Sequence, residues 1–121
     1  MAVKTVIAVM TDLFFLVQVI GAAKPLEMKV INVKDKATAL EKLKDAPAAF
    51  VIDLTCMAAD PLTIIAAASV TPGVTTIGFL PHVQTELRQQ ALDAGCDHVL
   101  ARSVFAQRLP ELLAATLDTD L

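Results

Sequence analysis

The stretch Ala48-Ala49-Phe50-Val51-Ile52-Asp53-Leu54-Thr55 decides the fold. It is an apolar run that follows Pro47 and is broken by a single carboxylate. A short continuous run of this kind predicts a strand that is covered on both faces, as in a parallel sheet. Asp53 would then lie at the carboxyl end of that strand, where open α/β sheets bind ligands. Aspartate also commonly caps turns and helix starts, so a structural role stays open beside the functional one.

Outward from this strand, strand-like and helix-like segments alternate strictly. We expect further strands over 5–10, 28–33, 74–80 and 98–101, and helices over 13–23, 37–46, 60–70, 82–94 and 104–117. Strict alternation implies right-handed βαβ crossovers. The sequence therefore predicts an α/β fold with three α/β/α layers and a doubly wound parallel five-stranded sheet. Residues 1–121 leave no room for a second domain.

Several local signals place the ends of these elements. Asp60-Pro61 is a favoured helix start, because an acid caps the helix and proline suits its first position. Gly95 suits the left-handed position that follows a helix. Pro110 is expected in or near the first turns of the last helix. Lys29 and Asn32 within an otherwise apolar strand predict that this strand lies near a sheet edge.

The composition excludes several classes of function. A chain of 121 residues with 55% hydrophobic residues, a net charge of −3 and a mean hydropathy of +0.62 can bury a core without metals or disulfides. Its acidity gives no electrostatic reason to expect nucleic acid or an anionic membrane as partner. Asp12 interrupts the apolar stretch 6–23, which argues against a membrane span. Without a secretory signal, we expect a cytoplasmic protein in which Cys56 and Cys96 are reduced, buried thiols.

Two spaced motifs carry a resemblance to a known family. The first is Asp53-Leu-Thr-Cys-Met-Ala-Ala-Asp60-Pro61, and the second is Ala91-Leu-Asp-Ala-Gly-Cys-Asp-His-Val-Leu-Ala-Arg102-Ser103. Together with the order of elements, they resemble the receiver domain of bacterial two-component response regulators. This resemblance covers essentially the whole chain. It implies a flavodoxin-like, CheY-like fold with strand order 2-1-3-4-5.

The resemblance also assigns roles to individual residues. It implies that Asp53 is the phosphoacceptor and that Arg102 stands where the family has a lysine that contacts the phosphoryl group. The family holds Mg²⁺ with two adjacent acids after its first strand, and here this pair is Thr11-Asp12. Asp12 and Asp53 could still supply two oxygens for Mg²⁺, but we expect a lower affinity. The family's switch hydroxyl after the fourth strand has no counterpart in 78–82, and Ser103 replaces the usual proline.

Two interpretations of a receiver-like chain follow. In one, Asp53 is phosphorylated and the change is read at the surface. In the other, which the missing acid and hydroxyl favour, the chain is a degenerate or pseudo-receiver. This second reading is a stand-alone, non-enzymatic signalling module that docks a sensor kinase or a downstream effector.

A third interpretation is a small α/β protein that binds a nucleotide or phosphate. Its ligand would lie in a crevice at the carboxyl edge of the sheet, where helix N-termini point. The expected lining residues of this crevice are Thr11, Asp12, Thr55, Phe79 and His82. No glycine-rich dinucleotide loop, Walker sequence or placed nucleophilic triad supports an enzyme.

Two surfaces are candidates for protein partners. By resemblance, one lies on the last two helices and the strand between them, and would include Val83, Leu87, Val104, Phe105, Arg108 and Leu112. The other is the first helix, Leu13-Phe14-Phe15-Leu16-Val17 followed by Val19-Ile20, which is apolar on all sides. One buried face does not need so many apolar residues, so this helix suggests a homodimer interface.

Overall fold

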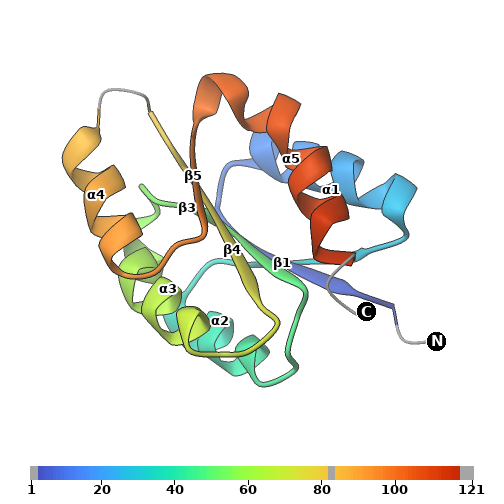
Figure 1. Ribbon diagram of the computed structural model, residues 1–121, viewed down its shortest axis with the longest axis horizontal. Coiled ribbons are helices and arrows are strands. Elements are labelled where there is room, and N and C mark those ends of the chain that lie inside the picture. Colours follow the sequence, from blue (N-terminus) through green and yellow to red (C-terminus); the bar gives the residue numbers. More distant parts are fainter. Residues whose placement is uncertain (1–2, 82–83, 118–121) are drawn as a thin grey trace.

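Five parallel strands form one sheet in the order β2-β1-β3-β4-β5, which confirms the predicted topology (Figure 1). The computed structural model describes residues 3–81 and 84–117. The strands are β1 (Thr5–Val9), β2 (Lys29–Val33), β3 (Ala49–Asp53), β4 (Thr75–Leu80) and β5 (His98–Ala101). The helices are α1 (Leu13–Ala23), α2 (Lys36–Leu43), α3 (Pro61–Ser69), α4 (Thr85–Asp93) and α5 (Arg102–Leu117), with short 3-10 turns at Lys24–Leu26 and Met57–Ala59.

The helices cover both faces of the sheet and divide the core in two. Helices α1 and α5 lie on one face, and α2, α3 and α4 lie on the other (Figure 1). Alternate residues of β3 supply the two halves: Ala49 and Val51 pack toward α1 and α5, while Phe50 and Ile52 pack toward α2 and α3. Every residue of β3 is buried, as a strand covered on both faces requires.

The start of α3 and the end of α4 follow the predicted signals. Asp60 is the N-cap residue of α3 and Pro61 is its first residue, but the Asp60 side chain accepts from the Thr63 hydroxyl and not from a backbone N–H of the helix. After α4, the N–H of Gly95 donates to the carbonyl of Leu92, and the N–H of Cys96 donates to that of Ala91, both at 3.0 Å. This pair of hydrogen bonds is a Schellman motif, and Gly95 adopts the expected positive φ of 104°.

The prediction for Pro110 was wrong. Helix α5 begins at Arg102, so Pro110 lies inside the helix instead of in its first turns. An interior proline removes the hydrogen bond to the carbonyl four residues earlier. That carbonyl belongs to Ala106, which is an exposed residue, so water can replace the missing donor. The helix begins two residues before the predicted residue 104.

Two further expectations concern the cysteines and the membrane. Cys56 and Cys96 are both free and buried. Burial raises the pKa of the Cys96 thiol, whose S–H donates to the carbonyl of His98 at 3.2 Å. Within residues 3–81 and 84–117, no helix has the length and apolar character needed to cross a membrane.

Two glycines with different surroundings, Gly95 and Gly21, test the role assigned to the glycine after α4. A Cβ on Gly95 would lie 2.6 Å from the Cβ of Ser69, and the substituted residue would have to keep the positive φ that side chains disfavour. A Cβ on Gly21 meets nothing within 4 Å. We expect Gly95→Ala to lower the free energy of unfolding by about 1–3 kcal/mol. Gly21→Ala, inside a helix, should raise it by about 0.5–1 kcal/mol. Urea unfolding followed by far-UV circular dichroism measures both, and equal effects would contradict the assignment of strain to Gly95.

Candidate functional site

Asp53 lies at the carboxyl end of β3, as predicted, and its carboxylate is held by its own turn. The side chain is 5% exposed. Its Oδ1 accepts hydrogen bonds from the backbone N–H of Thr55 at 2.9 Å and from the Thr55 hydroxyl at 2.6 Å. A carboxylate that accepts from the backbone two residues later forms an Asx turn. The structure therefore gives Asp53 a structural task at the place where the functional one was predicted.

The loop after β1 brings Thr11 and Asp12 to the same edge of the sheet. Val9 pairs with Ile52 in the register of β1 and β3, so Met10 is level with Asp53, and Thr11 and Asp12 follow directly. Both are exposed. Asp12 is the N-cap of α1, and its Oδ1 accepts from the N–H of Phe14 at 2.9 Å. Asp12 thus also performs a structural task.

Asn32 fixes this loop from the neighbouring strand. Its side-chain amide donates to the carbonyls of Ala8 and Met10, each at 2.9 Å. These hydrogen bonds fix the backbone at the end of β1, directly before Thr11. From the sequence, Asn32 predicted only that its strand lies near a sheet edge, and the edge position of β2 is confirmed. A lone amide in an apolar strand next to a predicted ligand edge could have signalled the positioning role.

Arg102 lies at the start of α5, but its guanidinium is directed to another helix. Its Cζ lies 5.2 Å from the ring centroid of Phe15 on α1, within the range of a cation–π contact. Among the described residues, no ion pair joins Arg102 to Asp53 or Asp12. The structure therefore does not bring the predicted phosphate-contacting residue onto the predicted phosphoacceptor.

Phe79 requires a correction, because its side chain is fully buried. It packs against Phe15 and Phe105, with ring centroids 5.0 and 4.4 Å away. Residues of a parallel strand alternate between its faces, and at Phe79 the side chain enters the core instead of an open crevice. His82, the fifth predicted lining residue, lies outside the described residues.

The described cavities do not coincide with the predicted crevice. The one at the carboxyl ends of β4 and β5 has a volume of about 250 Å³ and is lined by Leu80, Pro81, Gln84, Thr85, Arg88 and Ala101. That is below the roughly 300–1,000 Å³ of typical ligand pockets. Thr11, Asp12 and Thr55 do not line this cavity or the three larger ones of about 430–530 Å³ formed by described residues.

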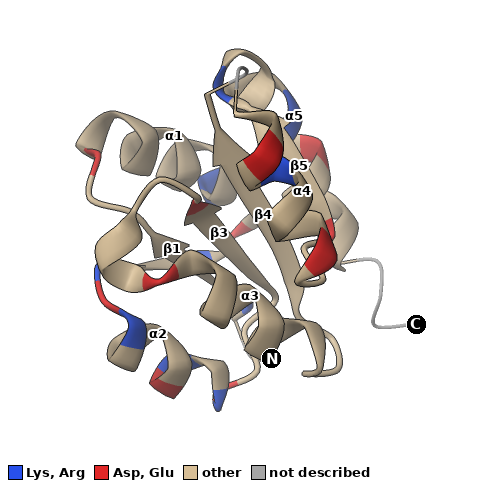
Figure 2. Ribbon diagram, turned by 90° about the vertical axis from the view of Figure 1, so that its left-hand side faces the viewer, with Lys and Arg blue, Asp and Glu red and all other residues tan. Residues whose placement is uncertain are grey.

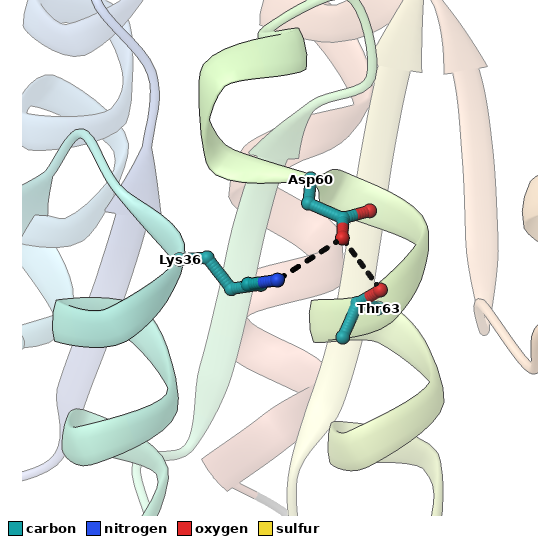
Figure 3. Close-up of polar contacts among 3 residues, drawn as sticks. All are labelled: Lys36, Asp60 and Thr63. Carbon is teal, nitrogen blue, oxygen red and sulfur yellow. Dashed lines mark hydrogen bonds and ion pairs between the residues drawn. The ribbon is translucent and has the colours of Figure 1, made fainter.

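The second acid of the first motif, Asp60, joins two helices. Its Oδ2 accepts from the Thr63 hydroxyl at 2.8 Å and lies 3.4 Å from the Lys36 Nζ at the start of α2 (Figure 3). The Thr63 hydrogen bond, and then Lys36, lower the pKa of Asp60. A lowered pKa keeps this carboxylate ionised as the pH falls through the range of an ordinary aspartate. The contact to Lys36 could not be predicted from the sequence, because it depends on how α2 and α3 pack.

The second motif has a structural core of its own. Asp97 accepts from the N–H of Thr76 at 2.9 Å, and the Thr76 hydroxyl accepts from the N–H of Asp97 at 2.9 Å. Thr76 is fully buried, so both of its polar groups need such partners. This reciprocal pair ties the start of β5 to β4, at the end of the sheet opposite Asp53.

The donor set at the candidate site suits a metal only weakly. Two carboxylates lie at the edge, and each has one oxygen in a backbone hydrogen bond. The described residues contain no group of three side chains of the metal-binding types. Mg²⁺ commonly keeps several waters and takes one or two carboxylates together with phosphate oxygens. Asp12 and Asp53 could supply these two carboxylates, and the described residues offer no third one beside them.

Comparisons with known proteins identify the fold. The sequence matches no known family model, and no curated protein is a detectable sequence relative. A response regulator from Hahella chejuensis shares 16% identity and a TM-score of 0.82, with 98% of each chain covered. A response regulator from Thermotoga maritima shares 17% identity and a TM-score of 0.78, covering 97% of this chain and 99% of its own.

A third similar structure holds the metal that the resemblance implies. It is the receiver domain of a sensor histidine kinase from Pseudomonas aeruginosa, with magnesium in its active-site cleft. It shares 16% identity and a TM-score of 0.78, and 97% of this chain and 99% of that one are covered. The chain thus has the CheY-like receiver fold, as the sequence motifs predicted.

Substitutions at Asp53 test its structural task. Asp53→Ala removes the acceptor of two hydrogen bonds, and we expect it to lower the free energy of unfolding by about 1–3 kcal/mol. Asp53→Asn keeps an acceptor oxygen and should cost less than about 1 kcal/mol. Thr55→Val, which removes only the hydroxyl, should lie between them. Urea midpoints rank the three variants. An Asp53→Ala variant as stable as wild type would show that the hydrogen bonds from Thr55 to Asp53 do not stabilise the fold.

Proposed function

We propose that the chain is a receiver-like signalling module that acts through protein–protein interaction and does not depend on phosphorylation of Asp53. The observation that carries this proposal is the Asp53 carboxylate, whose Oδ1 is held by the N–H and hydroxyl of Thr55. The receiver fold supports the class of module, since proteins of this fold include response regulators and a kinase receiver domain.

The surroundings of Asp53 support the loss of phosphoryl chemistry. A phosphoacceptor must present a carboxylate oxygen to a donor, yet this side chain is 5% exposed. A cation must then neutralise the added charge, yet the Arg102 guanidinium lies over Phe15. Leu80-Pro81 at the end of β4 provides no hydroxyl to follow a phosphoryl group. Three separate parts of the receiver mechanism are therefore displaced or missing.

Mg²⁺ binding is proposed to be weak, and docking is proposed not to require it. Asp12 and Asp53 would hold the ion, and water would supply the remaining ligands. When bound, the ion would offset negative charge at this edge of the sheet. Thr11 replaces the acid that would make a stronger site.

Phosphorylation is tested by intact-mass spectrometry after incubation with Mg²⁺ and acetyl phosphate. We expect no phosphoryl adduct on the wild-type chain, because Asp53 is almost fully buried, its Oδ1 is held by Thr55, and among the described residues no ion pair joins it to a cation. A receiver domain with a complete acid pair, incubated in the same tube, verifies that the donor is active. An adduct on wild type that disappears in Asp53→Asn would overturn the proposal and make Asp53 a working phosphoacceptor.

The metal site is tested by restoring the missing acid. Thr11 is exposed, so Thr11→Asp should fold normally, and it should bind Mg²⁺ at least about tenfold more tightly through its extra carboxylate. Isothermal titration calorimetry measures both affinities, and Thr11→Asn serves as the uncharged control. Equal affinities for Thr11→Asp and wild type would show that the lost acid is not what weakens the site.

A further inference from the structure

Helix α1 presents a second apolar face that none of residues 3–81 and 84–117 covers. One face, with Phe15, Val19 and Ala23, packs into the core. On the other, Leu13, Phe14 and Val17 are 68%, 66% and 66% exposed, and Ile20 is 46% exposed. We call Leu13, Phe14, Val17, Ile20 and Gly21 the outer stripe. Residues 13–23 contain no charged side chain, and Figure 2 shows α1 in tan along its length, whereas α2 carries charges of both signs.

The outer stripe has a regular shape with Val17 at its centre. At about 100° per residue, the other four members lie within about 60° of Val17 around the helix axis. A stripe of this width is what a helix normally turns toward a core. The spacing i, i+1, i+4, i+7 and i+8 is symmetric about Val17, so the positions of the stripe, although not its residue types, are the same counted from either end.

The exposed area matches a small interface. The four large side chains of the outer stripe expose roughly 100 Å² each, or roughly 400 Å² together. Two copies would remove about 800 Å² of apolar surface, and the flanking backbone and polar side chains would bring the total near 1,000–1,200 Å². Interfaces of this size form weak, reversible dimers.

We propose that the outer stripe binds a second copy of this chain, with the two α1 helices antiparallel about a two-fold axis at Val17. In this arrangement Val17 meets Val17, Phe14 meets Ile20, and Leu13 meets Gly21 of the second copy. Gly21 has open space where a Cβ would stand, so it leaves room for the Leu13 side chain. A two-fold interface requires a self-complementary surface, which the symmetric stripe supplies.

Charge at the ends of the stripe favours this antiparallel arrangement. Asp12 precedes the stripe and Lys24 follows it, and both are exposed. An antiparallel pair brings Asp12 of each copy toward Lys24 of the other, whereas a parallel pair would place like charges together. Among its described residues, the face on α4 and α5 expected from the family resemblance offers less apolar surface, because Phe105 and Leu112 are buried in the core. Val83, also expected on that face, lies outside the described residues.

Sedimentation velocity over a range of protein concentrations tests the dimer. The wild-type mass should rise from 12.8 kDa toward twice that value with increasing concentration. Val17→Glu places two like charges on the axis and should weaken dimerisation at least about tenfold. The matched control is Val70→Glu, because Val70 is an 80% exposed valine on a different helix end. Circular dichroism verifies that both variants are folded.

The symmetry axis is tested by mixing charge variants. Val17→Glu and Val17→Lys should each be monomeric alone and should associate with each other, because the residue on the axis meets its own copy. A monomeric wild type at all concentrations, as a face reserved for another partner would give, overturns the proposal. A dimer that Val17→Glu leaves intact, or charge variants that do not associate, would overturn it too.

A disulfide trap gives an independent readout. Val17→Cys should form an intermolecular disulfide on mild oxidation, whereas Leu13→Cys should not, because antiparallel helices hold the two copies of residue 13 about 12 Å apart along the axis. Both natural cysteines are buried and should stay unreacted. Efficient cross-linking of Leu13→Cys instead would overturn the antiparallel arrangement. Asp53→Asn should dimerise like wild type, so this inference stands or fails separately from the proposed function.

Discussion

The burial of β3 on both faces is the constraint on which the rest of the structure depends. Its five residues alternate between the two halves of the core and have no contact with water beyond Asp53. Such a strand is stable only if neighbouring strands take up its backbone hydrogen bonds and helices cover it above and below. The order of strands, the division of helices between the faces and the position of the site all follow from this requirement.

The same constraint explains why polar residues gather at the carboxyl edge. Where buried strands end, their last backbone groups still need hydrogen-bond partners. Asp53 accepts from its own turn, Asn32 donates to two carbonyls of β1, and Asp12 caps α1. A receiver domain needs carboxylates at this edge for phosphoryl chemistry. In this chain the carboxylates of Asp12 and Asp53 accept hydrogen bonds from the backbone of the segments that follow them.

The order and type of elements could be predicted from the sequence, because each depends on local patterns. The apolar run at β3, the cap at Asp60 and the glycine after α4 all express preferences of neighbouring residues. Phe79 and Arg102 could not be placed in this way. Whether Phe79 faces a crevice depends on the rings of Phe15 and Phe105, and the direction of Arg102 depends on Phe15, a residue on another helix. Such choices are made by packing between distant segments.

Helix α1 connects the two unusual parts of the molecule. Its N-cap, Asp12, is the remaining acid of the loop after β1, and its first turn carries Leu13 and Phe14 of the outer stripe. The hydrogen bond from the Phe14 N–H to Asp12 therefore stabilises the start of the helix that presents this surface. A cation bound at Asp12 would interact with the same carboxylate that caps the helix. Binding at the sheet edge and association through α1 would then be linked, and any such coupling must act equally in both directions.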